Sequence, residues 1–253
     1  MAEPQKIKTK KKRSALTVLI ITLVVAFVFH SFFYSTSLSE ESLTKSIEKY
    51  TEDNDVTLLE TEREGNHFIA LYTTEKPYYK GLVVFERGWN GLWAPVEYNK
   101  GTDICITLFV GPFVSDNRHV IGGVNCDSLI GSYEYTCYYS DVESYKYDET
   151  GKAIPVSSYG GNTSVYSNAV TKSNFIHIYN DEKKSSYSAD LKIYDSAGNS
   201  IESELTEAMK TNGIEEESEM KITGTGDIKF FTLLIILIGF LTVWNSSKAR
   251  RQK

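Results

Sequence analysis

The chain has 253 residues, of which 41% are hydrophobic and 24% are charged. This balance excludes a transporter with many membrane spans, which would be more apolar, and a disordered chain, which would be more polar. The formal net charge of −6 hides a segregation of charge: residues 1–14 carry +5, residues 245–253 carry +4 and residues 35–227 carry −16. The acidic middle would repel phosphates, so we expect no nucleic acid among the partners.

Two apolar segments near the ends of the chain predict membrane spans. Residues 15–34 carry no formal charge and as a helix would cover about 30 Å, the thickness of a bilayer core. Residues 228–244 form a second segment, at the short limit for a span, with Phe230 and Trp244 where interfacial aromatics belong. Basic residues flank the outer side of each segment, so the positive-inside rule places both termini in the cytoplasm. The sequence thus predicts a two-pass protein of the cell membrane.

Each apolar segment has an alternative interpretation. The first resembles a signal peptide followed by the small residues Ser-Thr-Ser at 35–37, but its apolar run is longer than is typical of such peptides. Residues 222–227 (ITGTGD), the second segment and the basic tail resemble the cell-wall sorting signal of Gram-positive surface proteins. Thr223 stands where that signal has proline. This resemblance implies a cell-wall-sorted surface protein as an alternative to a second span.

The region between the segments reads as mostly β. Residues 39–50 predict a helix, because Leu43, Ile47 and Tyr50 recur at helical spacing. Pro95 cannot donate to a ladder, so its strand should be an edge or bulged strand. Strand patterns occupy residues 56–63, 67–73, 81–87, 92–98, 103–110, 132–139, 174–179 and 188–194. The expected fold is α+β, predominantly β: an extracytoplasmic antiparallel-sheet domain between two transmembrane helices.

A serine- and glycine-rich stretch at residues 157–164 predicts a loop that divides the exposed region. An acidic run at residues 215–219 predicts a solvated stalk before the second span. The predicted organisation is a basic cytoplasmic tail (1–14), a transmembrane helix (15–34), an extracytoplasmic domain (35–227) made of a β block (39–154), a second β block (165–200) and a helix with an acidic stalk (201–227), a second transmembrane helix (228–244) and a basic cytoplasmic tail (245–253).

The sequence Tyr-Asp-x-x-Gly-x-x-Ile occurs twice and predicts two tight turns. In each turn the aspartate, Asp148 or Asp195, can accept hydrogen bonds from backbone N–H groups two or three residues later. The glycine, Gly151 or Gly198, would then take the left-handed conformation that reverses the chain.

The sequence carries no catalytic or metal-binding motif that we could find. Cys-x-x-Cys, His-Glu-x-x-His, Gly-x-Ser-x-Gly, the phosphate-binding loop and the dinucleotide fingerprint are all missing, so we expect no enzyme, no metal and no cofactor. In an oxidising compartment, the short loop between Cys126 and Cys137 favours a disulfide that leaves Cys105 as a thiol. The alternative is three buried, reduced cysteines.

Tyrosine is abundant, with 17 in the chain, and three of them share one face of a predicted strand. Alternation along residues 132–139 places Tyr133, Tyr135 and Tyr139 together. An exposed row of tyrosines is typical of a surface that binds protein or glycan, because a large rigid ring loses little entropy on binding. The alternative is a sheet face covered by its own amphipathic rings.

Residues 79–93 (YKGLVVFERGWNGLW) and 119–125 (HVIGGVN) are similar to uncharacterised exported or membrane-anchored domains of Gram-positive bacteria. The resemblance implies an early helix followed by β-hairpins, with residues 119–125 as a later strand. The resemblance implies an exported or membrane-anchored location, and it implies no catalytic activity and no known ligand. We therefore expect a non-enzymatic, membrane-anchored module that binds a protein or glycan on the outer side. The alternative is an accessory or sensory subunit of a membrane transport or secretion complex.

Overall fold

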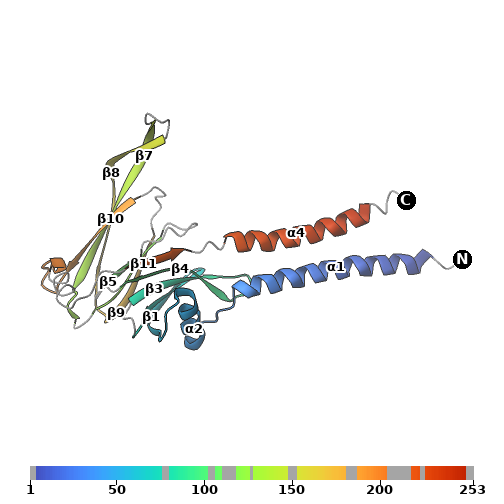
Figure 1. Cartoon of the computed structure of the whole chain (residues 1–253), viewed down its shortest axis with the longest axis horizontal. Coiled ribbons are helices and arrows are strands. Elements are labelled where there is room, and N and C mark those ends of the chain that lie inside the picture. Colours follow the sequence, from blue (N-terminus) through green and yellow to red (C-terminus); the bar gives the residue numbers. More distant parts are fainter. Residues whose placement is uncertain are drawn as a thin grey trace.

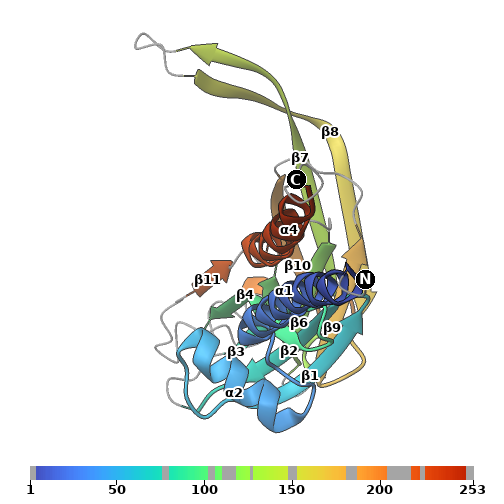
Figure 2. The same ribbon diagram turned by 90° about the vertical axis from the view of Figure 1, so that its right-hand side faces the viewer.

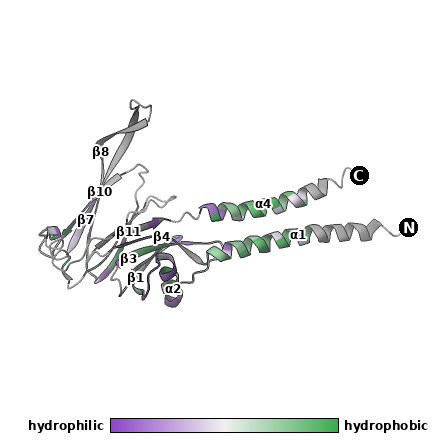
Figure 3. Ribbon diagram, in the orientation of Figure 1, coloured by the Kyte–Doolittle hydropathy of each residue, from purple (hydrophilic) through white to green (hydrophobic). Residues whose placement is uncertain are grey.

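The structure is a computed structural model, and it shows two long helices attached to one β-rich domain (Figure 1). It describes residues 4–75, 80–101, 106–109, 118–125, 128–147, 153–180, 187–203, 218–222 and 226–248. Helix α1 (Pro4–Phe33) and helix α4 (Gly226–Lys248) leave the domain on the same side. Their segments Leu16–Phe33 and Asp227–Trp244 are long and apolar enough to cross a membrane (Figure 3). This arrangement fits a two-pass membrane protein.

The two long helices pack against each other through small side chains. A Cβ added to Gly239 of α4 would lie 2.3 Å from Cγ2 of Thr22 in α1, so only glycine permits this approach. Ala26 and Thr232 are buried along the same contact. Most of the other apolar side chains of the two segments remain exposed, as expected for surfaces that face lipid.

Helix α2 (Glu40–Thr51) covers one face of the first sheet, which is antiparallel. Leu43 and Ile47 of α2 are buried against this sheet, as their helical spacing predicts. The strands of the first sheet lie in the order β1 (Thr57–Glu64), β2 (His67–Thr73), β3 (Lys80–Arg87), β4 (Trp93–Gly101) and β11 (Ser218–Ile222). The predicted helix at 39–50 and the strands predicted at 56–63, 67–73, 81–87 and 92–98 are therefore confirmed.

Two smaller antiparallel sheets complete the domain. The second sheet has the order β5 (Ile106–Phe109), β6 (Arg118–Val124) and β9 (Asn174–Asn180). The third sheet has the order β10 (Tyr187–Tyr194), β7 (Ser132–Tyr147) and β8 (Ala153–Ala169). The far ends of β7 and β8 form a long hairpin that projects beyond the domain (Figure 2).

The second sheet is packed on both faces. Val120 of β6 contacts the first sheet, whereas its neighbour Ile121 belongs to the core shared with the third sheet. A Cβ on Gly122 would lie 2.7 Å from Cδ2 of Leu82, so this glycine allows β6 to approach the first sheet closely. The described core is thus a stack of α2, the first, the second and the third sheet.

Pro95 lies in β4, which pairs with β3 along the strand but with β11 only from Glu97 to Gly101. Val84 faces Glu97 and Phe85 faces Pro95, which leaves Val96 as the extra residue of a bulge. The prediction of an edge or bulged strand is therefore confirmed by the bulge, and the proline stands where β4 has no described ladder partner on its β11 side.

The predicted loop at residues 157–164 is wrong, because this stretch belongs to the continuous strand β8. Its ladder partners are on β7, and two register shifts accommodate the long hairpin. The division into two β blocks is wrong for the same reason, since β9 pairs with β6 and β10 pairs with β7. Backbone pairing with a distant strand thus overrides a local composition that is typical of loops.

The predicted acidic stalk is in part a strand, since residues 218–222 form β11. Its sequence, SEMKI, alternates polar and apolar residues with the period of a strand. Pairing with β4 brings the chain back to the first sheet shortly before α4 begins. Residues 204–217, which hold most of the predicted helix at 201–210, lie outside the described residues.

The predicted turn around Gly198 is confirmed. Gly198 has a φ of +86°, and Oδ1 of Asp195 accepts hydrogen bonds from the backbone N–H groups of Ala197 and Asn199, both at 2.8 Å. The equivalent residues Asp148 and Gly151 lie outside the described residues.

We predict that Gly198→Val destabilises the domain by about 1–2 kcal/mol, because an L side chain is strained at this φ. No atom lies within 4 Å of the added Cβ, so the effect is one of backbone strain alone. The measurement is thermal unfolding of the full chain in detergent. Ser196→Ala is the control; Asn199 is unsuitable because its side chain donates to Asp195. Equal melting temperatures for Gly198→Val and the unmodified chain would contradict the turn assignment.

Candidate functional site

Two of the three tyrosines predicted to form a binding face, Tyr133 and Tyr135, are buried. Tyr133 and Tyr135 are 1% and 0% exposed, packed in the core between the second and third sheets. The side chain of Tyr139 lies outside the described part of β7. Alternation placed Tyr133 and Tyr135 on one face correctly, but could not reveal that the second sheet covers that face. The predicted exposed surface is therefore wrong at these two positions.

The buried tyrosines form a hydrogen-bonded aromatic network. The hydroxyl of Tyr133 lies 2.6 Å from Nδ1 of His177 and also bonds the hydroxyl of Tyr179. Burial raises the pKa of Tyr133, and burial together with the charge of Lys172 lowers the pKa of His177. Both groups are thus held neutral, which suits a core that two sheets share.

Cys137 is buried, and because Cys126 lies outside the described residues, the bridge between them stays a prediction. The Sγ of Cys137 lies 4.0 Å from each ring nitrogen of His119. These distances are longer than a nucleophile and its base require, so the pair is a packing contact. β7 directs Cys137 into the same core as Tyr135. Cys105 and Cys126 lie outside the described residues.

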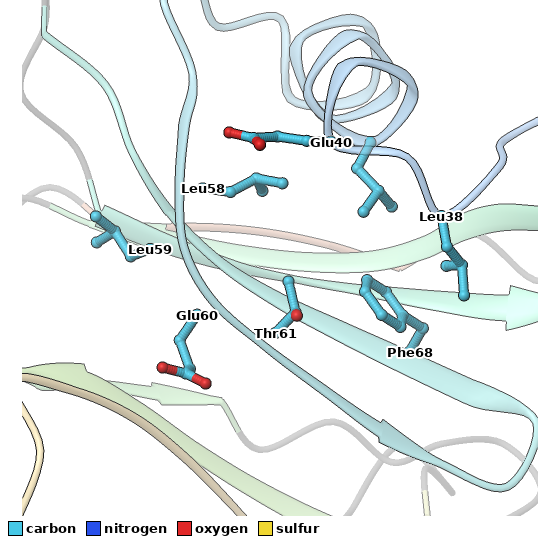
Figure 4. Close-up of a pocket in the computed structure, with 8 residues that line it drawn as sticks. Leu38, Glu40, Leu58, Leu59, Glu60, Thr61 and Phe68 are labelled. Carbon is cyan, nitrogen blue, oxygen red and sulfur yellow. The ribbon is translucent and has the colours of Figure 1, made fainter.

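An open groove of about 430 Å³ lies between the start of α2 and β1 (Figure 4). Its lining combines apolar side chains with Thr61 and two glutamates, Glu40 and Glu60, which lie on opposite sides of the apolar residues. Leu38 is 40% exposed there. Among the described strands, β1 is an edge of the first sheet and pairs with β2 alone. The apolar lining comprises Leu38, Leu43, Leu58, Leu59 and Phe68. We call this the α2–β1 groove.

No motif or periodicity in the sequence predicts the α2–β1 groove. Its two walls are separated by the chain reversal at residues 52–56, and only the packing of α2 brings them together. A pair of adjacent leucines at the start of a strand otherwise rich in glutamate is the one local anomaly. Leu58 packs towards α2 and Leu59 towards the second sheet, and a register shift lies between Leu58 and Glu60.

The domain is fixed to α1 by the turn between β3 and β4. The backbone N–H of Trp89 donates to Nε2 of His30 at 2.9 Å. The His30 ring is stacked between Tyr34 and Trp89, with centroid distances of 4.5 and 5.0 Å. A Cβ on Gly88 would lie 2.5 Å from the Tyr34 ring, so the turn can approach only because residue 88 is glycine.

The same hairpin also holds the end of α1 and the start of α4. The side-chain amide of Asn90 donates to the carbonyl oxygen of Tyr34 at 2.8 Å. Lys229 of α4 forms an ion pair with Glu86 of β3. One β-hairpin therefore contacts both candidate spans, and we call this set of contacts the membrane junction.

No three His, Cys, Asp or Glu side chains within the described ranges come together as a metal would need. Asp53, from the acidic turn after α2, instead pairs with Lys100 at 2.8 Å and accepts a hydrogen bond from Tyr72 at 3.1 Å. The ion pair of Asp53 with Lys100 neutralises both charges, and together with the hydrogen bond from Tyr72 it holds the end of α2 to the first sheet.

No known protein-family model matches this chain, and no curated protein matches it either. The resemblance to exported domains of Gram-positive bacteria therefore stays a prediction.

One buried carboxyl stands apart from these networks. Glu97 of β4 is 2% exposed, and its Oε1 has no hydrogen-bond partner among the described residues. Burial raises its pKa to about 8, so the group is largely protonated at neutral pH. The folded state therefore holds a proton that the unfolded chain releases near its ordinary pKa of 4.5.

We predict that the domain loses stability as the pH rises from about 5 to about 9, and that Glu97→Gln removes much of this loss. Because the pKa of Glu97 is higher in the folded state than in the unfolded chain, protonation of Glu97 stabilises the fold. This stabilisation is complete at a pH below the unfolded pKa of 4.5 and is lost as the pH rises through the folded pKa of about 8. Each pKa unit corresponds to about 1.4 kcal/mol. Melting temperatures across this range provide the test, with exposed Glu62→Gln as the control. Parallel pH profiles for Glu97→Gln and the unmodified chain would show that Glu97 does not carry the effect.

Proposed function

We propose that this protein is a non-enzymatic, membrane-anchored module that binds a partner protein through the α2–β1 groove. The observation that carries the proposal is an open, leucine-lined groove beside an edge strand. Its lining mixes leucines with polar residues, and Phe68, the one aromatic residue that lines it, is only 8% exposed, whereas sugar sites depend on exposed aromatic faces. We therefore favour a protein over a glycan as the ligand.

The charge around the groove indicates what kind of protein segment would fit. Glu40 and Glu60 line the groove, and Glu41 and Glu62 follow them on the same two elements. The region 35–227 as a whole carries −16. A segment with apolar side chains for the apolar lining and lysine or arginine for the glutamates would complement both features. We propose a basic, apolar segment of a partner protein as the occupant.

We further propose that the β-rich domain lies outside the cytoplasm and that both termini lie inside it. The basic flanks of both spans and the acidity of residues 35–227 support this orientation. Two helices that leave the domain on the same side support it as well (Figure 1). The contact of Gly239 with α1 favours a retained second span over a cell-wall sorting signal, which would be removed.

Tags at both ends provide the test of this orientation. Protease added to intact cells should cut the central domain and leave both terminal tags undigested in the membrane fraction, because the bilayer shields them. Permeabilised cells are the control, in which the tags should be digested too. Digestion of either tag in intact cells, or its loss from the membrane fraction, would contradict the two-pass orientation.

The accessory or sensory subunit remains a second candidate, and the membrane junction favours it. His30–Trp89 and Glu86–Lys229 connect both spans to one hairpin of the first sheet. A partner bound on that sheet would thus be mechanically linked to the spans.

We predict that the full chain in lipid nanodiscs selects basic, apolar sequences from a displayed library of random peptides. Leu38→Asp should weaken a selected peptide about tenfold or more, because it places a charge on the apolar lining. Leu129→Asp is the matched control: Leu129 is 51% exposed and lies away from the groove. Binding measured by fluorescence anisotropy should also weaken with salt. Acidic or salt-insensitive peptides, or equal losses for the two variants, would contradict the proposal.

A further inference from the structure

A second groove, of about 490 Å³, lies at the level of the candidate spans. It is bounded by α1, α4 and the turn between β3 and β4. Its lining is almost wholly apolar and includes Ile20, Leu23, Val24, Phe27, Trp89 and Ile236. Phe27 is 61% exposed and Trp89 is 56% exposed, so the groove opens to the surroundings of the helices. We call it the intramembrane groove.

The depth of the intramembrane groove matches one leaflet of a bilayer. It extends along α1 from His30, near the end of the helix, to Ile20. Ten residues of helix cover about 15 Å, which is half of a hydrocarbon core of about 30 Å. Trp89 lies at the end of the groove nearest the domain, where an indole is typical of the membrane interface. The medium that meets this groove in a membrane is therefore the acyl-chain region of one leaflet.

The groove contains one polar group without a partner. Nε2 of His30 accepts a hydrogen bond from the backbone of Trp89, and a backbone N–H can only donate. The neutral ring therefore carries its proton on Nδ1, which is buried and has no hydrogen-bond partner among the described residues. His30 as a whole is 2% exposed and lines the groove.

The other polar residues along the groove are already engaged. The side-chain amide of Asn90 donates to Oγ of Ser31 and to the carbonyl of Tyr34. The hydroxyl of Thr232 donates to the carbonyl of Ile228 at 2.7 Å. The Nδ1–H group of His30 is thus the donor that an incoming acceptor would meet within the described lining.

We propose that the intramembrane groove holds one acyl chain of a phospholipid from the domain-side leaflet, with the ester carbonyl oxygen accepting a hydrogen bond from Nδ1–H of His30. The ester carbonyls of a bilayer lie at the boundary between head groups and hydrocarbon, which is the level of His30 and Trp89. The acyl chain would run from there towards Ile20 along the apolar lining. This inference depends on the two spans and is independent of the ligand of the α2–β1 groove.

The groove is tested with the full chain reconstituted in bilayers that contain dioleoyl phosphatidylglycerol with a photoactivatable diazirine in one chain. We expect one labelled lipid per chain, mapped by mass spectrometry to the groove residues of α1 and α4. Val24→Trp should reduce this labelling about tenfold, because the indole fills the groove. Val25→Trp is the matched control: Val24 and Val25 are 55% and 50% exposed, but only Val24 lines the groove. Equal labelling of the two variants, or labelling spread evenly over the exposed helix faces, would overturn the proposal.

The role of His30 is tested by changing the lipid as well as the protein. Diester and diether phosphatidylglycerols with the same chains should differ several-fold in retention by the unmodified protein, measured by native mass spectrometry, because the ether lacks the carbonyl acceptor. In His30→Phe, which keeps an aromatic ring in the stack, the two lipids should be retained equally. Equal retention of both lipids by the unmodified protein would overturn the carbonyl contact. An unchanged ester preference in His30→Phe would assign that preference to another donor and overturn the role of Nδ1.

Discussion

The stacking of His30 between Tyr34 and Trp89 holds the end of α1, a candidate membrane span, against the β-rich domain. The ring lies on the last turn of α1, yet its hydrogen bond comes from a hairpin 59 residues later in the chain. Gly88 makes the contact possible, and Asn90 extends it to the carbonyl of Tyr34. Because α1 is held in this way, the chain that follows it enters α2 from a fixed position. Both grooves of the molecule depend on that position.

The second helix is held by a different kind of interaction. Lys229 lies at the start of a strongly apolar segment and reaches Glu86 on the first sheet, so the charge is neutralised where the segment meets the domain. Farther along, the absence of a side chain at Gly239 lets α4 approach Thr22 of α1 closely. An ion pair thus holds α4 where it meets the domain, and close packing of Gly239 on Thr22 holds it against α1 farther along.

Features that depend on neighbouring residues were predictable from the sequence, and features that depend on distant pairing were not. The stripe of Leu43 and Ile47 gave α2, and the Asp-x-x-Gly pattern gave the turn at Gly198. Residues 157–164 have the composition of a loop, but the ladder with β7 makes them a strand. Tyr133 and Tyr135 were placed on the correct face, yet whether that face meets solvent depends on β6 and β9, which lie elsewhere in the chain. The α2–β1 groove was not predictable for the same reason.

A short segment of chain, residues 34–38, connects the α2–β1 groove with the intramembrane groove. Tyr34 stacks on His30, which lines the intramembrane groove, and Leu38 lines the α2–β1 groove only four residues later. Between them, the backbone of Thr36 exchanges two hydrogen bonds with Trp93, at 3.0 and 2.9 Å, which fixes this piece to the first sheet. A rigid connection of this length gives little room for one groove to change its shape without moving a wall of the other. The binding of a partner outside the bilayer and the packing of lipid within it would then be coupled through residues 34–38, with the hairpin of β3 and β4 as the fixed support.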